Sequence, residues 1–132
     1  MIYVDASVVL AQLFAEDIRP APAFWDGTGL ASSRLLEYEV WTRVHASGVA
    51  ATVGEGVGEM LDRLAFLELS PLVLGRALDP FPVPVRTLDA MHLATIEYVR
   101  DHGERVSLAS YDRRMTTAAI ALGIRLVDLD EG

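Results

Sequence analysis

The chain has 132 residues, 52% hydrophobic and 23% charged, which is typical of one folded domain over residues 1–132. It contains no cysteine, and this excludes disulfides and thiolate metal sites. We find neither a secretory signal pattern nor an apolar run that could span a membrane, so we expect a cytoplasmic protein. The net charge of -8, with eleven arginines and no lysine, argues against unaided, tight attachment to nucleic acid.

The first half of the chain predicts strands alternating with helices. Residues 2–4 are a short apolar run ended by Asp-Ala-Ser, typical of a buried strand followed by a helix that must stop before Pro20. Residues 24–29 predict a helix end and a turn, and residues 30–32 a second strand. Apolar residues then recur at helical spacing between Ser33 and Gly48.

Glycines punctuate the next segment, residues 48–58, where we predict a loop. An amphipathic helix should follow it, with one apolar side formed by Met60, Leu61, Leu64 and Leu67. The Gly54–Gly58 run is not interpreted as a phosphate-binding loop, because it follows no strand and contains no lysine.

The second half continues the alternation. A short helix over 72–78 and a proline-stiffened extended segment over 79–84 lead to a helix from Asp89 to about Arg100. The remaining elements are a strand over 106–109, a helix over 112–122 and a last strand over 124–127. The fold class is therefore α/β, with a central parallel sheet flanked by helices on both faces. In such sheets the ligand site lies beyond the carboxyl ends of the strands.

Acidic residues occupy the positions where this fold would bring distant segments together. They are Asp5, Glu39, Asp89 and Asp112. Buried carboxylates repel one another and lose hydration, so a divalent cation is the simplest species that would hold them together. Alternatives remain open: Asp89 and Asp112 would also serve as helix caps, and Glu37 is a second candidate beside Glu39.

The segments around these acids resemble the PIN domain family, specifically the VapC-type toxin ribonucleases of toxin-antitoxin pairs. The resemblance covers nearly the whole chain, and its motifs in order are Ile2–Ser7, Ser33–Arg43, Arg86–Thr95 and Ser110–Met115 with Ala118, Ala119 and Gly123. It implies that the catalytic and metal-binding carboxylates are Asp5, Glu39, Asp89 and Asp112. It also implies that Ser7 and Ser110 supply supporting hydroxyls.

Such a site predicts Mg²⁺, or Mn²⁺, as cofactor, because hard oxygen ligands suit these cations, and the resemblance implies RNA as substrate. A metal-activated water as nucleophile would leave 5'-phosphate and 3'-hydroxyl ends. The resemblance further implies a cognate antitoxin and a homodimer. Candidate antitoxin contacts are Phe14, Trp25 and Trp41, for which core packing is the alternative.

Basic residues next to the acidic motifs are possible RNA contacts, namely Arg34, Arg43, Arg86 and Arg113. The alternative is local ion pairing, for example of Glu39 with Arg43. His92 lies three residues after Asp89, a spacing that can place two ligands on one helical face, but we favour a structural role for it in an apolar helix.

Two other classes of function are considered. A catalytically silent PIN-like module would bind a partner without cleaving RNA, although the four intact acidic positions argue against it. A receiver-like signalling domain shares the parallel sheet and the clustered acids, but it would need a lysine that this chain lacks.

Overall fold

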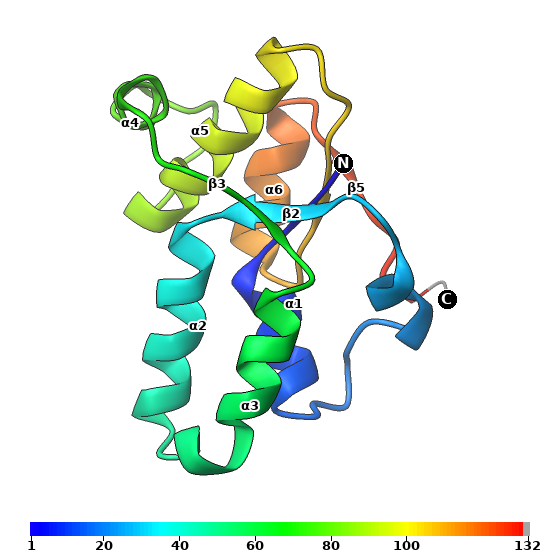
Figure 1. The fold of residues 1–132 in the computed structure, drawn as a ribbon. Coiled ribbons are helices and arrows are strands. Elements are labelled where there is room, and N and C mark those ends of the chain that lie inside the picture. The colour runs from blue at the N-terminus through cyan, green and yellow to red at the C-terminus, as the bar shows by residue number, and fades with distance from the viewer. Residues whose placement is uncertain (131–132) are drawn as a thin grey trace.

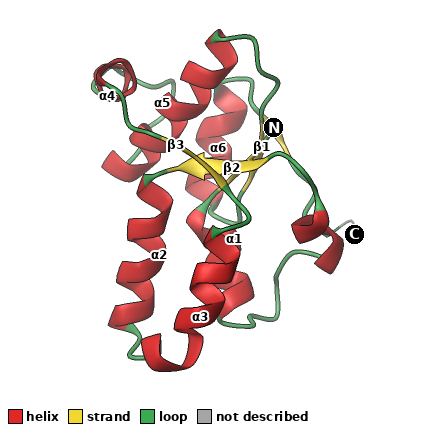
Figure 2. Ribbon diagram, viewed as in Figure 1, coloured by secondary structure: helices red, strands yellow, loops and turns green. Residues whose placement is uncertain are grey.

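The computed structural model describes residues 1–130, which form a five-stranded parallel sheet in the order β3-β2-β1-β4-β5. Figure 1 shows the chain path, and Figure 2 shows the short strands enclosed by helices. The strands are β1 (Ile2–Val4), β2 (Leu30–Ser33), β3 (Ala65–Leu67), β4 (Ser107–Ala109) and β5 (Arg125–Leu126). The predicted α/β class with a parallel sheet is confirmed.

Helices cover both faces of the sheet. They are α1 (Ala6–Leu13), the 3-10 helix η1 (Pro22–Asp26), α2 (Leu35–Ala46), α3 (Ala50–Leu61), α4 (Pro71–Ala77), α5 (Thr87–Asp101) and α6 (Arg113–Ala121). Two hydrophobic clusters fill the layers: one joins α1, α2 and α3, and the other joins α5 and α6. Successive residues of β1 supply both, since Val4 belongs to the first cluster and Tyr3 to the second.

The strand order places the direction switch beside β1. From β1 the chain builds β2 and then β3 on one side, and returns to place β4 on the other side. Val4 is paired with Ala109, so Asp5 and Ser110, which directly follow these strands, reach the same edge of the sheet. This is the edge at which ligands bind in open parallel sheets.

Two predicted elements around the glycines were wrong. Residues 50–58 of the predicted loop belong to helix α3, which also contains Met60 and Leu61 of the predicted helix, whereas Leu67 belongs to the edge strand β3. Two glycines of α3 lie where it packs on its neighbours: a Cβ at Gly54 would lie 3.9 Å from the Trp41 ring, and one at Gly56 would lie 3.7 Å from Leu13. This packing outweighs the low helix propensity of glycine.

The start of α5 is two residues earlier than predicted. The helix begins at Thr87, after the extended proline segment, so Asp89 lies inside its first turn. None of the helices within residues 1–130 is long and apolar enough to cross a membrane.

Candidate active site

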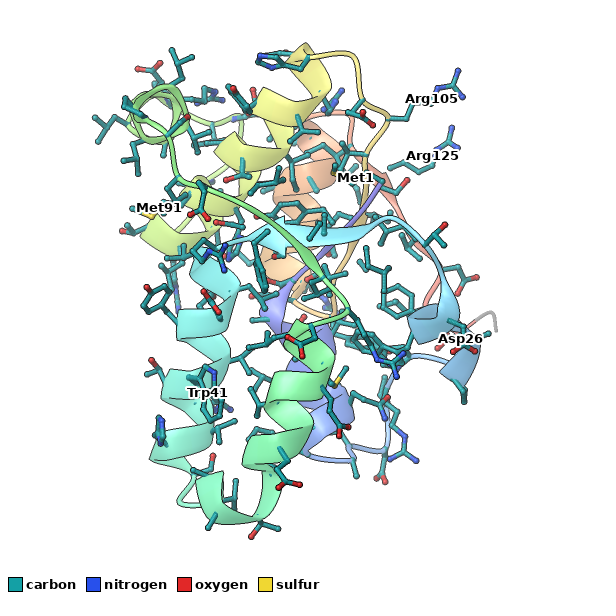
Figure 3. All side chains as sticks on the ribbon, viewed as in Figure 1. Met1, Asp26, Trp41, Met91, Arg105 and Arg125 are labelled. Atoms are coloured by element: carbon teal, nitrogen blue, oxygen red, sulfur yellow. The ribbon has the colours of Figure 1, made fainter. Side chains whose placement is uncertain are left out.

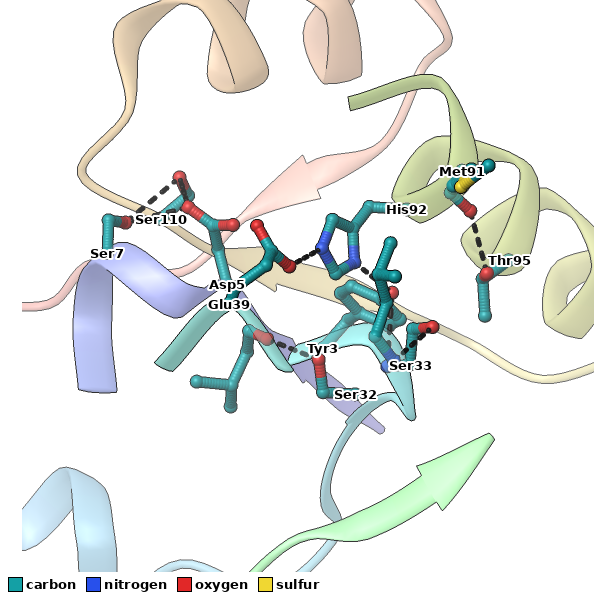
Figure 4. A network of polar contacts seen from close by, with 12 residues as sticks. Tyr3, Asp5, Ser7, Ser32, Ser33, Glu39, Met91, His92, Thr95 and Ser110 are labelled. Carbon is teal, nitrogen blue, oxygen red and sulfur yellow. Dashed lines mark hydrogen bonds and ion pairs between the residues drawn. The ribbon is translucent and has the colours of Figure 1, made fainter. Parts of the chain in front are cut away.

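Asp5 lies at the junction of β1 and α1, with an extended backbone and a side chain that makes no cap hydrogen bond to α1. Its Oδ2 instead accepts hydrogen bonds from Ser7 Oγ at 2.7 Å and from Ser110 Oγ at 2.8 Å. Figure 4 shows both serines on one side of the carboxylate. The Asp5 side chain is therefore fixed at the edge of the sheet instead of being used to begin the helix.

The two serine hydroxyls also fix the loop after β4. Ser7 Oγ accepts a hydrogen bond from the backbone N–H of Tyr111 at 2.9 Å, and Ser110 Oγ accepts one from Asp112 at 3.0 Å. Each hydroxyl thus accepts from the backbone and directs its single proton to Asp5. The structure places both predicted hydroxyls directly beside the predicted carboxylate.

Glu39 projects from α2 into the same region, and its Oε1 is hydrogen-bonded to Nε2 of His92 on α5. The other ring nitrogen of His92, Nδ1, lies 2.7 Å from the hydroxyl of Tyr3. Glu37 points elsewhere and pairs with Arg34 at 3.0 Å. Between the two candidate glutamates, the structure therefore places Glu39 at the site.

Electrostatics around His92 favour its charged form. Burial lowers the pKa of His92, but the hydrogen bond to Glu39 and the charges of Glu39, Asp5 and Asp89 outweigh it and raise the pKa above its ordinary value. Burial also raises the pKa of the Tyr3 hydroxyl, against the opposing hydrogen bond from the backbone of Ser33, so Tyr3 stays protonated.

Asp89 and Asp112 are engaged at helix starts. Asp89 Oδ2 accepts hydrogen bonds from the backbone N–H of Arg86 at 3.2 Å and from Nε of Arg114 at 3.1 Å. Asp112 is the N-cap of α6 and accepts from the N–H groups of Arg114 at 2.9 Å and Met115 at 3.4 Å. The capping alternative considered for these two residues is what the structure shows.

The structure consequently brings two of the four predicted carboxylates face to face, not all four. Figure 4 shows the Asp5 and Glu39 carboxylates turned toward one another, with His92 beyond Glu39. Over the part of the chain that is described, no three His, Asp or Glu side chains form a group that could hold a metal ion. Hydrogen bonds at the helix starts engage one oxygen of each of Asp89 and Asp112, and Arg114 also forms an ion pair with Asp89.

The donor chemistry nevertheless fits a hard divalent cation. Asp5 is only 8% exposed, and it makes no ion pair with any residue in the range 1–130. Both serine protons go to Oδ2, which leaves Oδ1 for another ligand. Carboxylate oxygens of this kind are the ligands that Mg²⁺ and Mn²⁺ prefer.

The predicted RNA-contacting arginines differ in their surroundings. Arg34 is held by Glu37 and by Glu68, the latter at 2.8 Å. The other three are exposed and form no ion pair with any described residue: Arg43, Arg86 and Arg113. The suggested pair of Glu39 with Arg43 is not formed, because Glu39 pairs with His92 instead.

The aromatic residues proposed as antitoxin contacts belong mainly to the core. Trp25 is 8% exposed and donates its ring N–H to Gln12, and both Phe14 and Trp41 pack, half-buried, against the first hydrophobic cluster. Sequence reasoning missed a nearby apolar groove, which borders Glu39 and is lined by Leu10, Leu35, Tyr38 and Leu88. The only sign of this groove in the sequence is an apolar residue, Leu35, at helical spacing from Glu39.

Fold and site together define a PIN-like α/β domain, in which acidic side chains gather at the switch point of a parallel sheet. The crystal structure of PAE2754 from Pyrobaculum aerophilum has this fold, with a TM-score of 0.62 and 22% identity over 89% of this chain and 78% of that one. No family model matches the sequence.

Curated relatives resolve the family. Ribonuclease VapC35 of Mycobacterium tuberculosis is 32% identical over 132 residues, and the match covers 96% of each chain. Ribonuclease VapC47 of the same species is 29% identical over 129 residues and 93% of each chain. The chain belongs to the VapC ribonuclease family, as the four motifs predicted.

Proposed function

We propose that this protein is a metal-dependent endoribonuclease that acts as the toxin of a toxin-antitoxin pair. The observation that carries the proposal is the Asp5 carboxylate: it is buried, fixed by two hydroxyl donors, directed toward Glu39 and without a cationic partner among the described residues. Membership of a family whose curated relatives are named ribonucleases supports the substrate class.

In the proposed reaction, Asp5 and Glu39 are the primary cation ligands. A bound Mg²⁺ or Mn²⁺ supplies an activated water near neutral pH and neutralises the charge that builds on the phosphate. Ser7 and Ser110 orient Asp5 through Oδ2, so that Oδ1 keeps its direction toward the cation. Because water and not the RNA 2'-hydroxyl attacks, the products carry 5'-phosphate and 3'-hydroxyl ends.

Asp89 and Asp112 are the other two carboxylates of the proposed site, and we do not assign them as direct ligands of the cation bound by Asp5 and Glu39. Both lie within the first turn or at the N-cap of helices next to the site, where their hydrogen bonds are to backbone N–H groups and to Arg114. A hydrated Mg²⁺ needs only one or two direct carboxylates, so these two aspartates would hold its waters, or a second cation that arrives with RNA.

Binding of RNA must overcome the net charge of -8. We propose that the cation and the guanidinium groups of Arg43, Arg86 and Arg113, which form no ion pair with a described residue, provide the local positive charge for a phosphodiester. Arg34 is a weaker candidate, since it is already neutralised by Glu37 and Glu68.

We further propose a cytoplasmic protein of one domain that forms a homodimer and is silenced by a cognate antitoxin. The apolar groove beside Glu39 is the proposed antitoxin surface, because Tyr38 and Leu88 on its rim are 65% and 44% exposed. A partner helix lying there would cover Glu39 and so block the site.

Total RNA incubated with purified, antitoxin-free protein tests the proposal directly. We expect cleavage with Mg²⁺ or Mn²⁺, none with EDTA, and none with Asp5→Asn. The matched control is Asp26→Asn, an exposed carboxylate at the end of η1 (Figure 3), which should cleave like the wild type. Products with 2',3'-cyclic phosphate ends would contradict the water mechanism. A folded wild type that cleaves no RNA at any metal concentration would favour the catalytically silent module.

A further inference from the structure

A buried histidine in the second hydrophobic layer is linked to the proposed site. His92 is 1% exposed and lies on α5, but its Nε2 reaches Glu39 on α2, 53 residues away in sequence. Its Nδ1 reaches Tyr3 on β1, a residue that is 0% exposed. The histidine therefore joins three elements, and a role in core packing alone does not account for its polar contacts.

The Tyr3 hydroxyl determines the direction of the hydrogen bonds. It accepts a hydrogen bond from the backbone N–H of Ser33 at 3.2 Å, so its own proton is available for His92 Nδ1. Neutral His92 then carries its proton on Nε2 and donates it to Glu39. Protonated His92 also donates from Nε2, and its Nδ1–H then donates to the Tyr3 oxygen. In both charge states the same N–H therefore fixes the same oxygen of Glu39.

Glu39 is consequently held in the way that Asp5 is held. Ser7 and Ser110 bind one oxygen of Asp5, and His92 binds one oxygen of Glu39. In Figure 4 the donors stand on opposite sides of the two carboxylates, whose remaining oxygens face the space between them. A flexible glutamate side chain loses rotamer freedom when it binds a ligand, and a fixed partner removes that cost in advance.

We propose that His92, oriented by Tyr3, is a positioning residue that fixes the Glu39 carboxylate for cation binding. This inference rests on the proposed function, since His92 and Tyr3 would support a ligand of the same metal site. Outer-layer partners of this kind typically change metal affinity by about 10- to 100-fold when they are removed.

Calorimetric titration of metal-free protein with Mn²⁺ is the test. It compares two substitutions of His92 of which only one keeps an N–H donor for Glu39. In His92→Gln, the amide keeps an N–H donor near the Nε2 position; in His92→Met, a side chain of similar length has none. We expect His92→Met to weaken Mn²⁺ binding by about 10-fold or more and His92→Gln by no more than about 3-fold. The matched control His45→Met, on the exposed end of α2, should bind like the wild type.

Cleavage at increasing Mn²⁺ supplies a second measurement that mere loss of structure would not reproduce. High Mn²⁺ should restore the cleavage rate of His92→Met, because the ligand is present but poorly oriented, whereas Asp5→Asn should stay inactive. If His92→Met does not fold, Tyr3→Phe tests the same chain of contacts, with an expected loss of about 3- to 10-fold in Mn²⁺ affinity.

The outcomes separate this inference from the proposed function. A wild type that neither binds Mn²⁺ nor cleaves RNA would remove the metal site itself. A wild type that does both, with folded His92→Met or Tyr3→Phe binding Mn²⁺ as tightly as the wild type, would overturn only the positioning role. Equal weakening by His92→Gln and His92→Met would also overturn it, because the N–H donor would then not be what matters.

Discussion

Two pairs of carboxylates lie at the same edge of the sheet but are held by different partners. Asp5 and Glu39 are bound by side-chain donors from other elements, two serine hydroxyls and one imidazole. Asp89 and Asp112 are bound by backbone N–H groups at helix starts, and Asp89 also by Arg114. The first pair depends on tertiary structure, whereas the second is satisfied almost entirely by local contacts.

The difference shows which carboxylates are prepared for a ligand. Asp5 forms no ion pair with any residue in the range 1–130, and its two serine donors leave Oδ1 for a cation. Asp89 and Asp112 already stabilise helices, so direct binding to a cation would cost them part of that stabilisation. We therefore expect substitutions in the two pairs to have different consequences for activity and for stability.

The largest effect should come from Asp5→Asn. The amide oxygen can still accept the two serine hydrogen bonds, so the free energy of unfolding should change little. Loss of a direct cation ligand should reduce single-turnover cleavage of a short RNA by about 10³-fold or more, since metal ions contribute several kcal/mol to the transition state. Cleavage within 10-fold of the wild type would contradict the proposed role of Asp5.

A smaller effect on cleavage is expected at Asp112. Its substitution by asparagine or by alanine distinguishes the role of the side chain as helix cap from the role of its charge. Asparagine is as good an N-cap as aspartate, whereas alanine should lower the free energy of unfolding by about 1 kcal/mol. Urea denaturation measures this difference. If Asp112 acts around the cation, both variants should lose about 10- to 100-fold in cleavage. If Asp112→Asn cleaves RNA at the wild-type rate, Asp112 serves only as a helix cap.

The smallest effect should follow from Arg114→Gln, which removes the guanidinium that competes for Asp89. Half-exposed ion pairs contribute at most about 1 kcal/mol, so Mn²⁺ affinity should rise by no more than about 5-fold. Arg113→Gln is the matched control, because its neighbouring guanidinium is exposed and forms no ion pair with the described residues. Weaker Mn²⁺ binding in Arg114→Gln alone would mean that Arg114 supports the site.

Rules that depend on chain order predicted much of the site. A carboxylate that ends the first strand of a parallel sheet falls at the switch point, and this rule placed Asp5, whereas Ser7 and Ser110 came from the family resemblance. Helical spacing favoured Glu39 over Glu37, and the structure agrees. The helix start at Asp112 was also predictable, because an aspartate there interacts favourably with the helix dipole, whereas α5 begins two residues before Asp89.

Features that depend on packing between distant elements were not predictable. Three glycines in α3 lower its helix propensity, and the helix is stabilised by its contacts with α1 and α2. Leu67 of the edge strand β3 lies at helical spacing from Met60, Leu61 and Leu64, so the apolar period favoured a helix where the structure has a strand. The interaction of His92 with Glu39 needs α5 and α2 to meet across the sheet edge, and neither sequence segment contains that information.

Anomalous scattering from crystals grown with Mn²⁺ would test the central claim most directly. The account predicts a Mn²⁺ peak within coordination distance of both Asp5 and Glu39 in the wild type, and no peak there in Asp5→Asn. A wild-type crystal at saturating Mn²⁺ with no peak between these two carboxylates, or with Mn²⁺ bound only elsewhere, would contradict it.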